Sequence, residues 1–336
     1  MAAYTTIDNP ELYFQCKIWT GTGSSNALTL DGDEDMQPDY VMIKQRSGTQ
    51  QWNGYDDLRG VQKYLGWNTT IGENTQTQGL TAFGSDGFTV GTDDMVNKSS
   101  STYVAYCWKE SATAGFDMVL YTGTGSAHTI SHSLSAVPDV MITKGRSFGD
   151  GWIPYFKTSG NPIILALDDT VADRYSSRWG TFFNSTAPTS SVFTVGTDSA
   201  INTSSGTHIA YLWSAKQGFS KFGTYVGNAN ADGPFIWTGF SPSFVMAKMT
   251  SGTGNWNTFD NKRTDSGGGN IIDKRIKNNS NAAEIDGSAN QIDFLSNGFK
   301  WRGTDDDTNI SSGTFVYMAF AEAPFVNSKG VPANAR

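Results

Sequence analysis

The segment that decides the fold is Asn97-Lys-Ser-Ser-Ser-Thr102, together with the aromatic run that follows it, Tyr103-Val-Ala-Tyr-Cys-Trp108. Related segments occur twice more, as Asn202-Thr-Ser-Ser-Gly-Thr207 before His208-Ile-Ala-Tyr-Leu-Trp213 and as Asn309-Ile-Ser-Ser-Gly-Thr314 before Phe315-Val-Tyr-Met-Ala-Phe320. The second copy begins 105 residues after the first, and the third begins 107 residues after the second. Such a period indicates an internal repeat, with each copy long enough to have a core of its own.

Other landmarks recur in the same order around these segments. A proline-led run begins at Pro38, Pro138 and Pro242, and a tryptophan follows each run, at Trp52, Trp152 and Trp256. We therefore divide the chain into an N-terminal arm (1–11), three repeats (12–113, 116–217 and 221–325) and a C-terminal tail (326–336). The two linkers have only about six residues each, so we expect neighbouring repeats to touch.

Composition and local pattern predict an all-β protein. Aromatic residues make up 13% of the chain, 37 of its 336 residues are glycine, and charged residues reach only 17%, against roughly 25% in an average soluble protein. Each repeat holds six to eight short runs of aromatic and β-branched residues separated by Gly, Asn, Asp and Ser. We predict three tandem antiparallel β-sandwiches. In an alternative arrangement the three repeats share sheets in one pseudo-threefold body.

The charge and hydropathy patterns exclude several classes of partner. A net charge of −8 repels polyanions, so nucleic acid is not an expected partner. No stretch approaches the ~18 apolar residues of a membrane-spanning helix, so we expect no membrane insertion. The first residues lack the basic and apolar regions of a secretory signal, which favours synthesis in a cytoplasm.

Cysteine and histidine show no metal-site pattern. Cys16 and Cys107 take positions that are hydrophobic in the other repeats, so buried free thiols are favoured over a disulfide. His128 and His132 are four residues apart, but zinc needs three or four convergent ligands and no further Cys or His lies nearby. We expect these two histidines to lie in a solvated loop.

The acidic loops leave calcium as an alternative to having no cofactor. Asp31-Gly-Asp-Glu-Asp35 begins like a calcium loop, yet Met36 and Met42 stand where an EF-hand would have Gly and Glu. No nucleophile elbow, phosphate-binding loop or dinucleotide fingerprint is present. We therefore expect no catalytic residues and a protein that is not an enzyme.

Aromatic side chains are the remaining candidates for ligand contacts, because sugar rings stack on exposed aromatic faces. Trp52, Trp152 and Trp256 occur in every repeat and are predicted to be core, as is Trp301. Two tryptophans are specific to one repeat: Trp67, whose counterpart is near Leu167, and Trp179, which has Tyr175 and Arg178 beside it. The predicted ligand-binding residues are Trp67, Trp179, Tyr175 and Arg178.

The collected motifs resemble a family. Trp19-Thr-Gly-Thr-Gly23, Pro38-Asp-Tyr-Val-Met42 and Ser85-Asp-Gly-Phe88 are similar to segments of repeat-bearing structural proteins of tailed bacteriophages, especially marine ones. That resemblance covers about 12–336 and implies concanavalin- or laminin-G-like sandwich units in a tail or fibre protein. It carries no catalytic motif and identifies no ligand residue. The chain also lacks the heptads and short β-helical repeats of fibre shafts, so a long-fibre role is in doubt.

The resemblance implies a virion protein present in several copies per particle and in contact with other virion proteins. The main hypothesis is a tail- or fibre-associated, lectin-like module that attaches to host-surface polysaccharide. The alternatives are a purely structural capsid decoration or tail and fibre adaptor and, more weakly supported, a tail-associated glycan depolymerase. A pseudo-threefold arrangement would further let one chain imitate a homotrimer on a symmetry axis of the particle.

Overall fold

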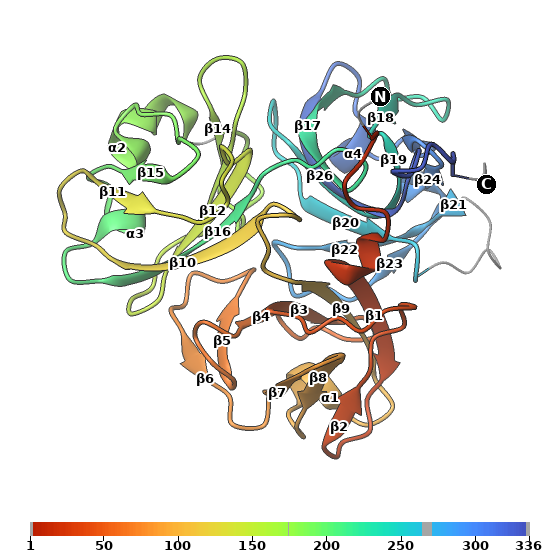
Figure 1. Ribbon diagram of the computed structural model, residues 1–336, viewed down its shortest axis with the longest axis horizontal. Coiled ribbons are helices and arrows are strands. Elements are labelled where there is room, and N and C mark those ends of the chain that lie inside the picture. Colours follow the sequence, from red (N-terminus) through yellow and green to blue (C-terminus); the bar gives the residue numbers. More distant parts are fainter. Residues whose placement is uncertain (1–2, 174, 264–270, 334–336) are drawn as a thin grey trace.

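The computed structural model describes residues 3–173, 175–263 and 271–333, and within them the chain is all-β with antiparallel sheets (Figure 1). We call the strands β1–β9 the first segment, β10–β16 the second and β17–β26 the third. The described helices are only three to five residues long. They are η1 (Pro10–Leu12), α1 (Asp94–Asn97), η2 (Ser176–Arg178), α2 (Trp179–Phe183), α3 (Ser199–Asn202), η3 (Ser288–Asn290) and α4 (Asp306–Asn309).

Three large sheets have the same order in their first four strands. In the first segment the order is β1 (Phe14–Thr20), β9 (Thr102–Trp108), β3 (Tyr40–Gln45), β4 (Asn53–Asp56), β5 (Lys63–Gly66) and β6 (Asn74–Thr75). In the second it is β10 (Phe116–Thr122), β16 (Thr207–Trp213), β12 (Val140–Gly145), β13 (Ile153–Phe156) and β14 (Ile163–Ile164). In the third it is β17 (Ser220–Val226), β26 (Thr314–Pro324), β19 (Phe240–Met249), β20 (Trp256–Asp260), β22 (Lys274–Lys277) and β23 (Ile285–Asp286).

A smaller sheet accompanies each large one. These sheets are β2 (Asn26–Leu28), β8 (Gly87–Val90) and β7 (Leu80–Gly84); β11 (His128–Ser131) and β15 (Val192–Val195); and β18 (Phe235–Trp237), β25 (Gly298–Trp301), β24 (Ile292–Leu295) and β21 (Ile271–Ile272). Phe88 packs in one cluster with Val41, and Phe193 packs in another with Met141. In the first two segments, apolar side chains of the small and large sheets therefore form a local core.

The recurrent asparagine ties each segment's loops together. Asn97 is fully buried; its Nδ2 donates to the carbonyl oxygens of Gly91 and Ser24, and its Oδ1 accepts from the amide of Thr22. Asn202 and Asn309 make corresponding bonds in the second and third segments. This side chain satisfies buried backbone groups that no strand pairs, which explains its presence in every copy.

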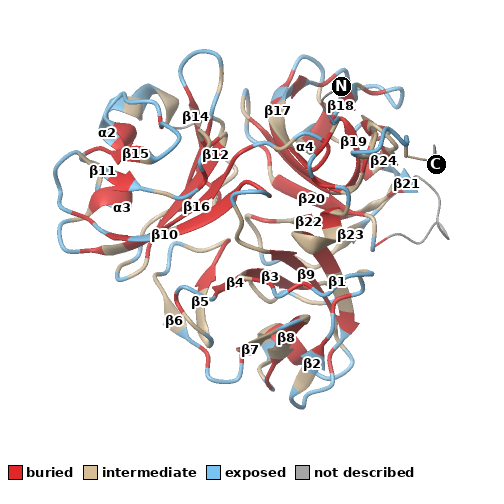
Figure 2. Ribbon diagram, in the orientation of Figure 1, coloured by how far each residue is buried: buried red, intermediate tan, exposed pale blue. Residues whose placement is uncertain are grey.

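The three segments meet around one aromatic core, as the three lobes of Figure 1 suggest and the buried residues in the middle of Figure 2 illustrate. Each recurrent tryptophan reaches into a neighbouring segment. The indole Nε1 of Trp52 donates to the carbonyl of Lys277 at 2.9 Å, that of Trp152 to Gly66 at 2.8 Å, and that of Trp256 to Ala166 at 2.9 Å. These three bonds link the segments in a closed ring. The prediction that these tryptophans and Trp301 are core residues is confirmed, because each is at most 1% exposed.

Main-chain hydrogen bonds cross the same three contacts. The amide of Glu73 donates to Arg146 across the contact of the first and second segments, which we call junction 1–2. Asp173 donates to Thr250 across junction 2–3, and Glu284 donates to Arg46 across junction 3–1. The segments are therefore joined as one body, with loop residues of each segment bonded to the next.

Both ends of the described chain lie against the third segment. The Tyr4 hydroxyl donates to the carbonyl of Gly239 at 3.0 Å, and Ile7 is buried in the shared core. The Asp8 carboxylate accepts from the amide of Ser328. Residues 5–8 are thus part of the folded body, and they bring the two ends of the chain together.

Two sequence predictions about single features can be checked directly. Cys16 and Cys107 are both buried and free, which confirms the predicted buried thiols. Their strands are neighbours, but Cys16 lies in the shared core and Cys107 in the first segment's local core. No helix in the described part of the chain is long and apolar enough to cross a membrane.

Candidate functional site

Trp67 lies in the centre of the molecule and cannot contact a ligand. Its side chain is only 2% exposed, its indole nitrogen donates to the Tyr40 hydroxyl, and its ring centroid is 5.6 Å from that of Trp152. The prediction of Trp67 as an exposed contact residue is therefore wrong. Its counterpart Leu167 is fully buried, so both copies use this position for the core.

The other three predicted residues do come together, on η2 and α2 of the second segment. The Arg178 guanidinium lies 5.7 Å from the ring centroid of Tyr175 and 5.0 Å from that of Phe182, and it forms an ion pair with Asp198. Trp179 is half-buried against the second segment's local core. Arg178 and Trp179 thus remain accessible at the surface, while Tyr175 and Phe182 support the guanidinium by cation–π contacts.

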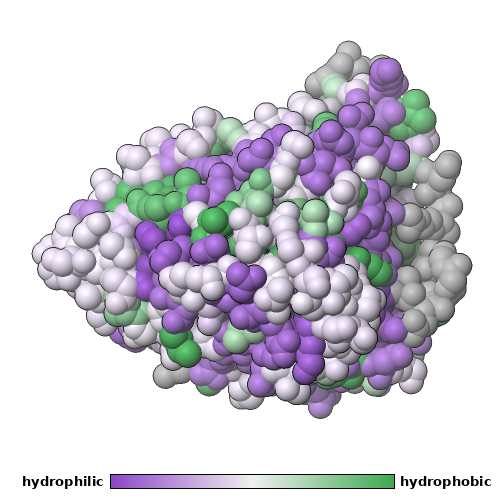
Figure 3. Space-filling view, turned by 90° about the horizontal axis from the view of Figure 1, so that it is seen from below, coloured by the Kyte–Doolittle hydropathy of each residue, from purple (hydrophilic) through white to green (hydrophobic). Residues whose placement is uncertain are grey.

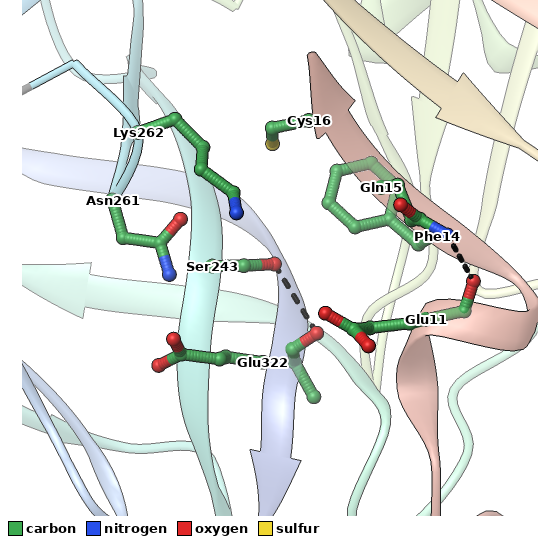
Figure 4. Close-up of a pocket in the computed structure, with 9 residues that line it drawn as sticks. Glu11, Phe14, Gln15, Cys16, Ser243, Asn261, Lys262 and Glu322 are labelled. Atoms are coloured by element: carbon green, nitrogen blue, oxygen red, sulfur yellow. Dashed lines mark hydrogen bonds between the residues drawn. The ribbon is translucent and has the colours of Figure 1, made fainter. Parts of the chain in front are cut away.

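A polar hollow of about 350 Å³, including its open mouth, lies at junction 3–1 (Figure 4). It is bounded by β1 and η1 on one side and by β19, β26 and the turn after β20 on the other. Its lining residues are Glu11, Phe14, Gln15, Cys16, Ser243, Asn261, Lys262, Ala321 and Glu322. Figure 4 shows the Lys262 ammonium and the carboxylates of Glu11 and Glu322 around the open space.

The groups in this hollow are held by the chain itself. The Gln15 side-chain amide donates to the Glu11 carbonyl at 3.0 Å, and the Ser243 hydroxyl donates to the Ala321 carbonyl at 3.1 Å. Burial raises the pKa of the Cys16 thiol well above its usual range, which keeps it protonated and a poor nucleophile. The lining contains two carboxylates, an ammonium and amides, a set that suits hydrogen bonding to a small polar molecule.

The equivalent place at junction 1–2 is acidic. Strand registers put Glu110 where Glu322 stands and Asp117 where Gln15 stands. The Met118 amide donates to both Glu110 Oε1, at 3.3 Å, and Asp117 Oδ1, at 3.0 Å, so the two carboxyl groups share one donor. Burial and then the neighbouring Asp117 raise the pKa of Glu110 to about 8. A protonated Glu110 avoids the repulsion between two neighbouring carboxylates.

The residues considered for metal binding have ordinary structural partners. His128 Nδ1 lies 3.0 Å from the Ser126 carbonyl, and His132 Nε2 lies 3.1 Å from the Thr189 carbonyl. Asp31, which begins the calcium-like loop, pairs with Lys17. Among residues 3–173, 175–263 and 271–333, no group of three or more His, Cys, Asp or Glu side chains is placed to hold a metal ion.

Sequence reasoning missed an exposed aromatic pair on β18. Phe235 is 46% exposed and Trp237 is 44% exposed, and because they alternate along one strand they share a face. The signal was available in the repeats, since the first copy has Ala27 and Thr29 at the corresponding positions.

Among the described residues, no other exposed aromatic side chains gather in this way. Figure 3 shows one face of the molecule, on which hydrophilic and weakly polar residues predominate and hydrophobic residues form small separate groups. Exposed apolar side chains such as Ile71 and Val226 are isolated on loops and strand ends. Single exposed apolar residues are normal for proteins, so they indicate no further site.

Comparison with protein families gives one match. The model of a family described as "Domain of unknown function (DUF7483)" matches residues 9–324. That match spans nearly the whole chain and all three segments, including the junctions between them. No curated protein matches the chain.

Proposed function

We propose that this chain, which belongs to the DUF7483 family, is a structural protein of a tailed-bacteriophage virion. In this role it is a lectin-like body associated with the tail or fibres, and it attaches the particle to glycans on the host surface. The resemblance of its repeat motifs to phage tail and fibre proteins supports the setting. The three segments would be tandem lectin-like sandwiches, 12–113, 116–217 and 221–325, in a pseudo-threefold body.

The observation that carries this proposal is the shared core with segment-specific surfaces. The tryptophan indoles join the three segments through bonds of 2.8 to 2.9 Å, so the body behaves as one rigid support. Arg178 and Trp179 lie at its surface in the second segment, on an η2–α2 turn whose place in the third segment is taken by the shorter η3. A rigid support that presents different surface groups suits binding and assembly, and several copies on one particle turn weak contacts into firm attachment.

Glycan binding tests this function. The purified chain is applied to immobilised polysaccharide extracted from host cells, and the variants Trp179→Ala and Arg178→Ala are compared with it. His128→Asn serves as a matched control, because it is another surface change in the second segment that introduces the residue of the first copy, Asn26. We expect the wild type and the control to bind and both η2–α2 variants to bind more weakly. Binding retained by both variants would remove these residues from the site, and no binding by the wild type would contradict the glycan function.

A second candidate is a structural adaptor without a ligand. The closed ring of junctions favours it, because one chain with three similar lobes can occupy the place of a homotrimer on a symmetry axis. A reconstruction of the particle distinguishes the two. A copy seated with its three lobes around a threefold axis and buried by other virion proteins supports the adaptor, whereas lobes projecting from the particle support attachment.

A further inference from the structure

The exposed pair on β18 is unusual for its place in the fold. Phe235 and Trp237 each leave nearly half of their side chain in solvent, on a strand that lies at the edge of its sheet. Between them Ile236 points the other way and is buried. Exposing two large aromatic side chains side by side opposes solubility, so a folding role does not explain them.

The other two segments show that the fold does not need these aromatic residues. Phe235 lies opposite Lys300, and the equivalent registers pair Ala27 with Thr89 and Thr129 with Thr194. Trp237 lies opposite Gly298, and Ser131 occupies the matching place in the second segment. Small or polar residues therefore suffice at both positions, and the aromatic pair is an addition of the third segment.

The indole of Trp237 is held in a fixed orientation. Its ring packs edge-on against Phe325, with centroids 5.3 Å apart and planes at 76°. Phe325 is itself anchored, because its amide donates to the Gly239 carbonyl, which also accepts from the Tyr4 hydroxyl at 3.0 Å. The N-terminal arm and the C-terminal end of β26 thus clamp the supporting ring. A rigid aromatic face loses little entropy on binding a ligand.

Polar groups border the two rings. Lys300, opposite Phe235, forms an ion pair with Asp232 at 2.6 Å, and the Asp232 side chain is 80% exposed. The Lys221 ammonium donates to the Trp237 carbonyl at 2.7 Å. The border therefore offers accessible carboxylate and ammonium groups that can accept from and donate to hydroxyls, next to aromatic faces that are apolar.

We propose that Phe235 and Trp237 form a second carbohydrate-binding site, a platform on which the rings of an oligosaccharide stack while the Asp232–Lys300 pair bonds its hydroxyl groups. Sugars present this combination of apolar ring faces and hydroxyl edges. A protein partner fits less well, because a stable interface takes about 800 Å² from each side and the apolar part of this surface is two side chains wide. The inference rests on the proposed glycan attachment and adds a site that the η2–α2 group does not include.

Titration followed by NMR tests the platform. The wild-type chain, labelled with nitrogen-15, is titrated with two sets of free oligosaccharides. One set is built from glucose, galactose, mannose or N-acetylglucosamine, and the other is released from host polysaccharide. The indole signal of Trp237 is identified by its absence from Trp237→Ser. We expect a binding sugar to shift this signal, and we expect the double variant Phe235→Thr/Trp237→Ser to bind that sugar at least about tenfold more weakly.

Two controls distinguish loss of this site from misfolding, and failure of the platform from failure of glycan attachment. Val226→Thr changes an exposed apolar residue on the neighbouring strand β17 and should leave sugar affinity unchanged. The double variant should unfold at a temperature close to that of the wild type, since it installs the residues of the second segment. If a sugar binds, shifts the Trp179 signal and leaves Trp237 unmoved, the platform is overturned and glycan attachment stands. If no sugar of either set binds the wild type, both proposals are overturned.

Discussion

Junctions 3–1 and 2–3 occupy equivalent places in the molecule but are built from opposite chemistry. At junction 3–1 the Tyr106 hydroxyl of the first segment donates to Asp260 of the third at 2.6 Å, and Asp260 pairs with Arg263, both side chains being fully buried. At junction 2–3 the strand registers place Met318 and Phe156 where Tyr106 and Asp260 stand. The Phe156 ring stacks near Trp256 instead, with centroids 6.1 Å apart.

The difference shows which contacts the ring needs. Both junctions retain the tryptophan bond and the main-chain bond, so these close the ring whichever side chains surround them. Of these two junctions, only 3–1 carries the buried charges further, where Glu284 accepts from Arg263 and in two bonds from Arg46. Junction 1–2 repeats this network, with Tyr211 donating to Asp56, which pairs with Arg59, and with Arg59 and Arg146 both paired to Glu73. The free-energy cost of burying two ions is about as large as the favourable energy of their attraction. The charge networks therefore distinguish junctions 1–2 and 3–1 from junction 2–3, and the tryptophans and apolar residues supply the net stability.

The largest expected effect comes from leaving one buried charge alone. Replacing Arg263 by Met removes the charged partner of Asp260, which then lies buried with only the Tyr106 hydroxyl and two backbone amides as donors. We expect a loss of about 3–5 kcal/mol in the free energy of unfolding. Urea unfolding measures it. Ser159→Met makes the change at the matching place of the second segment, where the residue is exposed, and should alter stability by no more than about 0.5 kcal/mol. An Arg263→Met protein as stable as the wild type would show that Asp260 is not a buried charge.

Converting junction 3–1 to the apolar chemistry should reverse most of that loss. The triple variant Tyr106→Met/Asp260→Phe/Arg263→Met removes the polar groups together, so no charge is stranded, and Glu284 keeps Arg46. We expect it to lie within about 2 kcal/mol of the wild type by the same urea unfolding. A triple variant less stable than Arg263→Met alone would contradict the view that the tryptophans and apolar residues supply the net stability.

The hydrogen bonds of the three tryptophans should contribute equally to stability at all three junctions. Replacing Trp52, Trp152 or Trp256 by Phe keeps an aromatic ring and removes one hydrogen bond, which leaves a buried carbonyl without its donor. We expect each change to lower the free energy of unfolding by about 1–2 kcal/mol, with the three values close together. One tryptophan that costs far more than the others would show that its junction dominates and that the ring is not closed evenly.

Junction 1–2 gives an effect of another kind, a dependence on pH. Because the folded pKa of Glu110 is raised from 4.5 to about 8, folding binds a proton between these values, so this group's stabilisation is complete below pH 4.5 and is lost as the pH rises through 8. Burial lowers the pKa of Lys44 to about 7 and that of Lys144 to about 8, which acts in the opposite direction above pH 7. We therefore compare the unfolding temperature of Glu110→Gln with that of the wild type.

The wild type should lose stability relative to Glu110→Gln as the pH is raised from 5 to about 8. Glu34→Gln removes the same charge at an exposed position and serves as the control. The difference in unfolding temperature between the wild type and Glu34→Gln should not change with pH. Parallel curves for the wild type and Glu110→Gln would show that the pKa of Glu110 is not raised in the folded chain.

Comparison of repeats predicted the parts of the molecule that every copy repeats. The buried positions of Trp52, Trp152, Trp256 and Trp301 followed from recurrence, as did the all-β class from turn residues and aromatic runs. The junction contacts could not be predicted, because Tyr106 and Asp260 are 154 residues apart and nothing in either neighbourhood marks its partner.

The errors at the surface have a physical reason. Trp67 is specific to one copy, and we interpreted that as exposure, whereas the shared core accepts Trp at one junction and Leu167 at the equivalent place. The exposure of Phe235 and Trp237 could not be predicted, because alternation along a short strand does not show which of its two faces is buried. Only packing distinguishes the two faces, and here the exposed face is the one with the larger side chains.

The central claim is that three equivalent segments close on one shared core and act as a single rigid body. Scanning calorimetry of the intact chain tests it most directly, because independently stable segments unfold separately and a shared core unfolds once. A shared core predicts one transition whose calorimetric enthalpy equals its van't Hoff enthalpy. Two or three resolved transitions, or a calorimetric enthalpy two to three times the van't Hoff value, would contradict it.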